Sequence, residues 1–182
     1  MTLHLLHRHV LEDHLAGFET SPNPNHVSVV RRPVILSVLA HGDLEAFAGR
    51  LAAFSTMSAR FCGPGEWLVV SSAASADELT DRLGEVAGLS VCDQSDGKVV
   101  MAISGPSVRK ILAKCVAVDL HQDVFAEGEG ANMLCCHVAC HLARTGADAF
   151  EIIVPRSFAG SVFEELMEMG REYALTASFA QS

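Results

Sequence analysis

Residues 58–70, SARFCGPGEWLVV, hold two short runs on either side of a Gly-Pro-Gly sequence. Glycine and proline at 63–65 are typical of a tight turn, and the runs at 58–62 and 67–70 carry residues that favour strands. The stretch therefore predicts a β-hairpin. What lies on each side of this hairpin decides the fold class of the first half of the chain.

The flanks of the hairpin each predict a helix and a strand. Val34–Ala40 is an apolar, β-branched run typical of a buried strand, and helical spacing of apolar residues follows near 44–54. After the hairpin, Ser75 could cap a helix at 76–87, and residues 89–92 are typical of a further strand. The order is βαββαβ, which is that of a ferredoxin-like unit.

The second half of the chain predicts another α+β unit. Asp96-Gly97 is typical of a two-residue hairpin turn, and a strand at 99–103 follows it. Pro106 suits the first position of a helix that runs to about Cys115. The remaining expected elements are a strand at 150–154, a helix across 158–170 capped by Ser157, and a closing strand at 173–177.

These elements predict an α+β protein made of two small two-layer α/β-sandwich subdomains, the first of them ferredoxin-like. A proline- and asparagine-rich stretch at 19–26 separates a histidine-rich lead segment from the rest. We expect the lead segment over 1–26, the ferredoxin-like subdomain over 27–94 and the second α+β subdomain over 95–182.

Composition narrows the classes of partner and the compartment. Thirteen Lys and Arg against twenty-two Asp and Glu give the 182 residues a formal charge of -9, which disfavours binding to nucleic acid. The longest apolar runs fall far short of the ~20 residues that span a bilayer. Six cysteines with no apparent secretion signal indicate reduced thiols, so we expect a cytoplasmic protein away from the membrane.

Residues 135–141, CCHVACH, resemble a metal site, and secondary structure decides whether they can form one. On a helix, ligands four residues apart stand about 6 Å apart along the axis, which zinc can bridge. On one continuous strand they stand about 13 Å apart, which it cannot. A hairpin turning at His137-Val138 would place Cys135 opposite Cys140. Local propensity leaves helix and strand open.

Other polar residues give weaker indications of a site. Four histidines crowd the amino terminus, where a solvated face is the simpler interpretation. Arg144 and Arg156 each adjoin a strand end in an acidic protein, and an arginine fork suits a carboxylate across a subunit interface. Surface ion pairing within the chain is an equal alternative, and we name these two arginines as possible interface residues. The residues themselves nominate no catalytic, cofactor-binding or metal-binding position.

Three segments in combination resemble the gamma subunit of heterotetrameric sarcosine oxidase. They are RFCGPGEWLVV (60–70), DQSDGKVVMAISGPSVRKILAKCVAVDLHQDVFAEG (93–128) and FEIIVPRSFAGSVFEELMEMG (150–170), and the similarity runs from about 30 to 172. The resemblance implies strand for the part of the chain around CCHVACH, which then becomes a cysteine-rich hairpin that binds no metal.

The gamma subunit is itself similar to the folate-binding T-protein of glycine cleavage. That relative carries an Arg-Thr-Gly-Tyr-Thr-Gly-Glu run, whereas this chain has RTGADAFE at 144–151. The Arg-Thr-Gly portion is kept and the Tyr-Thr-Gly-Glu portion is absent. The departure argues against folate binding, since function belongs to sites and not to folds.

The resemblance implies a structural, non-catalytic subunit of a complex with alpha, beta and delta subunits. Such complexes oxidatively demethylate sarcosine to glycine, pass the one-carbon unit to tetrahydrofolate and produce hydrogen peroxide. FAD, FMN, NAD, tetrahydrofolate and zinc are expected on the other subunits. The alternatives are a free-standing folate-binding one-carbon transferase and a metal or redox module built on the cysteines.

Overall fold

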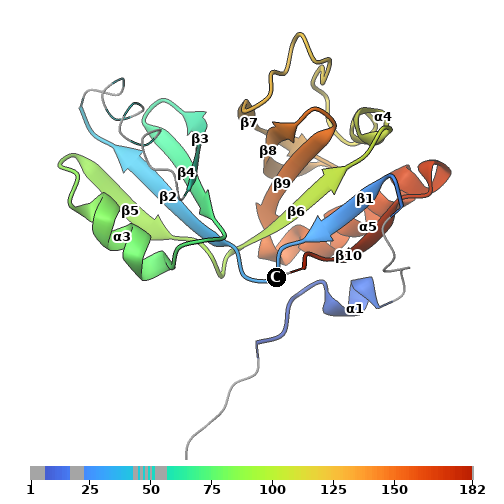
Figure 1. Ribbon diagram of the computed structural model, residues 1–182, viewed down its shortest axis with the longest axis horizontal. Helices are drawn as coiled ribbons and strands as arrows, with labels where there is room; N and C mark the ends of the chain where they lie inside the picture. The colour runs from blue at the N-terminus through green and yellow to red at the C-terminus, as the bar shows by residue number, and fades with distance from the viewer. Residues whose placement is uncertain are drawn as a thin grey trace, which may run out of the picture.

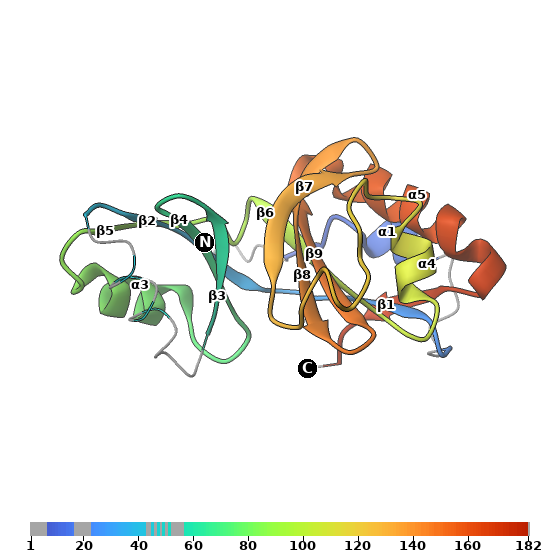
Figure 2. The ribbon, with the colours of Figure 1, turned by 90° about the horizontal axis from the view of Figure 1, so that it is seen from above.

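The structure is a computed structural model that describes residues 7–16, 23–42, 45, 47, 49, 51 and 57–181. The chain forms an α+β protein with two β-sheets, which diverge from a common junction like the arms of a V (Figure 1). The helices lie on the outer faces of the two sheets (Figures 1 and 2). None of the described helices is long and apolar enough to cross a membrane.

The smaller sheet has four strands in the order β3-β4-β2-β5, and every neighbouring pair is antiparallel. Its strands are β2 (Val34–Ala40), β3 (Ser58–Gly63), β4 (Glu66–Ser71) and β5 (Leu89–Asp93). The predicted hairpin is therefore confirmed as β3 and β4. Helix α3 (Ala76–Gly84) covers the outer face, and its predicted cap is confirmed, because the Ser75 hydroxyl accepts a hydrogen bond from the Glu78 N–H at 3.2 Å.

The larger sheet has six strands in the order β10-β1-β6-β9-β8-β7, of which only β1 and β10 pair in parallel. Its strands are β1 (His26–Val29), β6 (Lys98–Ser104), β7 (Gly130–Cys135), β8 (Val138–Gly146), β9 (Ala149–Pro155) and β10 (Thr176–Phe179). The helical segments around it are α1 (Glu12–Leu15), α4 (Val108–Leu112), α5 (Ala159–Gly170) and the short η1 (Arg156–Phe158) and η2 (Arg171–Tyr173).

Alternation along the strands divides the core into three parts. Side chains on one face of β2, such as Leu36 and Val38, pack under α3, while Ile35 points the other way, because successive strand residues face opposite sides. Ile35 joins a small cluster with Leu68, Val100 and Ile153, which come from both sheets. The two units are therefore in apolar contact at the junction.

Three sequence predictions about the fold are wrong. Residues 27–29 lie in the larger sheet and not in the first unit, because β1 pairs with β6 and β10. Asp96-Gly97 does not close a hairpin, since β5 and β6 belong to different sheets and the turn carries the chain between them. Ser157 lies within η1, and α5 begins without a side-chain cap.

Two further predictions are met in part. In the predicted helix near 44–54, residues 45, 47, 49 and 51 are helical, and the other positions lie outside the described residues. The helix predicted to begin at Pro106 is shorter than expected, since α4 spans Val108–Leu112. Pro106 directly follows Gly105, which has a φ of +131°. A side chain at Gly105 would collide with the Pro24 carbonyl oxygen, so only glycine fits at this position.

Candidate functional site

The cysteine-rich stretch is a β-hairpin, as the strand prediction requires. Strands β7 and β8 pair across a two-residue turn at Cys136 and His137, whose φ values are +48° and +65°. The turn lies one residue earlier than predicted. Cys135 consequently faces Val138 in the strand register and not Cys140, although a side-chain hydrogen bond still joins Cys135 and Cys140.

A fourth cysteine that the sequence did not connect with the hairpin joins it in space. The Cys136 N–H donates to the Cys115 carbonyl at 2.9 Å, and the sulfurs of Cys135 and Cys136 are 3.9 Å apart. Hydrogen bonding with Cys135 raises the pKa of Cys115 to about 12, and hydrogen bonding with Cys115 raises the pKa of Cys136 to about 12. The raised pKa values disfavour Cys115 and Cys136 as nucleophiles, whereas hydrogen bonding with Cys135 lowers the pKa of Cys140.

The two histidines of the stretch do not join the sulfurs. His137 is exposed in the turn, whereas His141 is buried at the junction, with its Nε2 3.2 Å from the Phe61 carbonyl oxygen of β3. Burial lowers the pKa of His141, so its ring is neutral. Across the part of the chain that the structure describes, no three His, Cys, Asp or Glu side chains are arranged to hold a metal ion.

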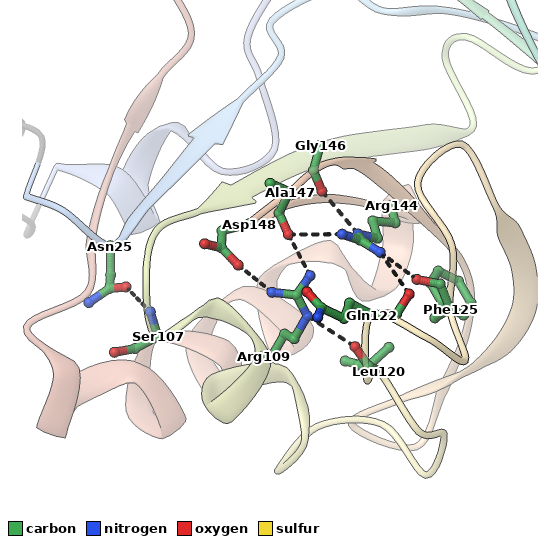
Figure 3. A network of polar contacts seen from close by, with 10 residues as sticks. All are labelled: Asn25, Ser107, Arg109, Leu120, Gln122, Phe125, Arg144, Gly146, Ala147 and Asp148. Atoms are coloured by element: carbon green, nitrogen blue, oxygen red, sulfur yellow. Dashed lines mark hydrogen bonds and ion pairs between the residues drawn. The ribbon is translucent and has the colours of Figure 1, made fainter.

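Arg144 binds backbone carbonyl groups within the chain (Figure 3). Its Nε donates to the Gly146 oxygen at 3.1 Å, one terminal nitrogen donates to Phe125 at 2.9 Å and Gln122 at 3.3 Å, and the other donates to Ala147 at 3.3 Å. Only 7% of the residue is exposed. Arg144 is therefore buried by its own chain, because the inward face of β8 carries it under the loop before β7.

Arg109 of α4 holds the same turn from the other side (Figure 3). It pairs with Asp148, donates to the Ala147 carbonyl, and reaches Leu120 with Nε at 3.0 Å from the carbonyl oxygen. Its guanidinium also lies 5.6 Å from the centroid of the Phe150 ring. The two arginines together fix the β8–β9 turn.

A cavity of about 900 Å³ lies at the junction of the two sheets, beside the β1–β2 connection. Arg60 of β3 and Glu151 of β9 line it and form an ion pair at 2.5 Å. Arg60 is 8% exposed, and its Nη1 has no hydrogen-bond partner among the described residues. Size and a buried charged group make this cavity the best candidate for binding a small molecule.

No sequence signal indicated this cavity, since Arg60 and Glu151 are 91 positions apart in the chain. Arg156, the second arginine that the sequence nominated, is partly buried and does not lie near Arg144. Its Nη2 donates to the Arg8 carbonyl at 3.3 Å, and it lines a second, smaller cavity. The structure therefore assigns the two nominated arginines to separate places.

The fold and the cavity define a two-sheet α+β protein with a candidate ligand site at the junction of the sheets. Residues 59–180 match the GCVT N-terminal domain family, and the chain belongs to this family.

Relatives of known sequence are of two kinds. The chain is 31% identical over 118 residues to an aminomethyltransferase of Corynebacterium aurimucosum, which covers 60% of this chain and 32% of that protein. It is 30% identical over 114 residues to the sarcosine oxidase subunit gamma of Corynebacterium sp. (strain P-1), which covers 62% of this chain and 56% of that protein. The chain thus matches about a third of the first kind and about half of the second.

Two solved structures share the fold. One is the heterotetrameric sarcosine oxidase from Corynebacterium sp. U-96, with a TM-score of 0.79, 21% identity and coverage of 98% of this chain and 100% of that chain. The other is the glycine cleavage system aminomethyltransferase T from Bartonella henselae, with a TM-score of 0.61, 14% identity and coverage of 92% and 50%.

Proposed function

We propose that this chain is the gamma subunit of a heterotetrameric sarcosine oxidase. The complex would oxidatively demethylate sarcosine to glycine, transfer the one-carbon unit to tetrahydrofolate and produce hydrogen peroxide in the cytoplasm. One observation carries the proposal: this chain corresponds to one whole chain of the Corynebacterium complex, whereas it corresponds to only half of the aminomethyltransferase.

We further propose that the subunit is structural and that the alpha, beta and delta subunits carry the chemistry and the cofactors FAD, FMN, NAD, tetrahydrofolate and zinc. The hydrogen bonds of Arg144 support a structural role, because its guanidinium donates to four backbone carbonyl oxygens of the same chain. The raised pKa values of Cys115 and Cys136 also disfavour a thiolate nucleophile. Of the two arginines nominated for the subunit interface, Arg156 is the better placed, because it is the less buried.

We infer the domain organisation from the sheets. The smaller unit is ferredoxin-like over 34–93, because its first and second strands flank the third and its fourth pairs with the first. The larger unit comprises β1 together with residues from about 98 onward. This division differs from the one drawn at residue 27 because β1 belongs to the larger sheet.

A second function, folate-dependent one-carbon transfer by this chain alone, is favoured by one observation. The cavity of about 900 Å³ is large enough for a cofactor of that size, and Arg60 offers a charged donor there. Titration of the isolated chain with tetrahydrofolate, followed by an assay of methylene transfer, separates the two functions. Tight binding with transfer would favour the transferase.

The subunit proposal is tested by omission. The four subunits are co-expressed from the source genome, with and without this chain, and the purified product is assayed for oxidation of sarcosine. We expect the complete set to assemble and turn over, and the set without this chain to give a low yield of assembled complex. The isolated chain should show no flavin absorbance and no turnover. An active three-subunit complex of undiminished yield would overturn the proposal.

A further inference from the structure

A cavity of about 380 Å³ lies where the two units are connected. The β1–β2 connection contributes Arg31 and Arg32, and the β5–β6 connection contributes Ser95 and Asp96. The lead segment, the start of β6 and η1 complete the lining with His7, His9, Lys98 and Arg156. A ligand in this cavity would therefore touch both connections between the sheets.

The cavity gathers positive charge in a protein whose formal charge is -9. Four Lys and Arg side chains line it, against the single carboxylate of Asp96. Within the described ranges, none of the four lies within 4.0 Å of a carboxylate oxygen. By contrast, ion pairs engage these other cations: Arg8, Arg60, Arg82, Arg109, Lys114 and Arg171.

Contacts with neutral groups position two of the four cationic side chains in the cavity without cancelling their charge. The Arg31 guanidinium lies 3.8 Å from the centroid of the Phe179 ring, and Arg156 donates to the Arg8 carbonyl at 3.3 Å. His9 accepts a hydrogen bond from the Leu11 N–H at its Nδ1, so that its neutral ring carries the proton on Nε2. The lining thus combines fixed donors with uncompensated charge.

His9 lies among the cationic side chains that line the cavity. Burial lowers the pKa of His9 first, and the nearby charges of Arg156, His7 and Arg31 lower it further. The same field that disfavours a proton on His9 favours an anion beside it.

We propose that this cavity binds the phosphate group of a small molecule. Guanidinium groups match the oxygens of phosphate in pairs, and a doubly charged anion fits four cations better than a single carboxylate does. A volume near the lower end of the range for ligand sites suits a small phosphorylated molecule or a diphosphate. An acidic segment of a partner protein is the competing occupant, and a cavity of this volume lined from five separate parts of the chain favours the smaller ligand. This inference does not depend on the proposed function.

The test is isothermal titration calorimetry on the full chain at constant ionic strength. The ligands are inorganic phosphate, diphosphate, ADP and a hexaglutamate peptide. The variants are Arg32→Glu and Lys98→Glu, and the control is Lys110→Glu, which makes the same charge change at an exposed residue of α4 outside the cavity. Far-ultraviolet circular dichroism checks the fold of each, and Arg32→Gln and Lys98→Met replace any variant that does not fold.

We expect saturable binding of diphosphate, tighter than that of phosphate, and a weakening of about tenfold or more in each cavity variant. The control should change the dissociation constant by about twofold at most. ADP binding as tightly as diphosphate would identify a nucleotide as the source of the phosphate, whereas weaker ADP binding would identify a free anion. No saturable binding, an equal loss in Lys110→Glu, or binding of hexaglutamate in preference to every phosphate ligand would overturn the proposal.

Discussion

Replacement of Arg144 by alanine should lower the stability of the larger unit more than a substitution at the surface does. The change removes a guanidinium that donates to four carbonyl oxygens, two of them at 2.9 and 3.1 Å and two at 3.3 Å. Hydrogen bonds from a charged donor contribute about 1.5 kcal/mol or more each, and the two longer ones contribute less. A loss of about 3 kcal/mol in the free energy of unfolding follows.

This loss corresponds to a fall of about 6–12 °C in Tm for a chain of this size. The assay is urea denaturation followed by circular dichroism, with Arg156→Ala as the matched control. Arg156 makes one long contact with a backbone carbonyl, so its replacement should change stability by no more than about 0.5 kcal/mol. Equal effects of the two substitutions, or a loss below about 0.5 kcal/mol for Arg144→Ala, would refute the structural role assigned to Arg144.

Three further predictions concern the junction and the cysteine hairpin. Burial lowers the pKa of His141 below 6.5, so the unfolded chain takes up a proton that the folded chain does not. The free energy of unfolding should therefore fall as the pH drops below about 6.5. In urea titrations at a series of pH values, His141→Gln should make the free energy of unfolding depend less steeply on pH. An unchanged slope would contradict this. His137→Gly should raise the free energy of unfolding in urea titrations by about 0.5–1 kcal/mol, since glycine tolerates the φ of +65° in the turn; a lower free energy of unfolding would count against the strained turn. Glu151→Gln should lower the free energy of unfolding by about 1–2 kcal/mol, because it leaves Arg60 without its counter-charge. The double variant Arg60→Met/Glu151→Leu should lose less stability than the sum of the losses of Arg60→Met and Glu151→Leu, and strict additivity would show that the ion pair is not coupled.

The sequence predicted those elements whose signals are local. The 58–71 hairpin follows from turn residues between two strand-like runs, and the Ser75 cap follows from one hydroxyl before an amphipathic helix. The strand assignment for CCHVACH came from the family resemblance, because its pattern suits a helix and a strand equally well. Its turn was misplaced by one residue because two non-glycine residues, Cys136 and His137, adopt positive φ.

Long-range pairing explains what the sequence could not predict. Strand β1 joins the larger sheet through His26, which pairs in register with Thr176 and lies 2.6 Å from its hydroxyl oxygen through Nδ1. No local pattern reveals a partner 150 positions away. The same reasoning applies to Asp96-Gly97, whose turn chemistry is correct, although the strands on either side of it belong to different sheets.

The candidate site was less predictable than the fold. Arg144 was nominated because it is a charge beside a strand end, but whether such a charge meets a partner subunit or its own backbone depends on a loop that lies 19–22 residues before it. The two cavities are assembled from connections and strand ends of both units, so that only the three-dimensional arrangement brings their charged residues together.

We have proposed that this chain works as one subunit of a sarcosine-oxidising complex. The most direct test is to tag the chain in its source cell, purify it gently from cells grown on sarcosine, and measure sarcosine-dependent formation of hydrogen peroxide in the eluate alongside its native mass. We expect a complex of four different chains that carries flavin and produces peroxide. A tagged chain that elutes alone, from cells whose sarcosine oxidase activity remains in the unbound fraction, would contradict it.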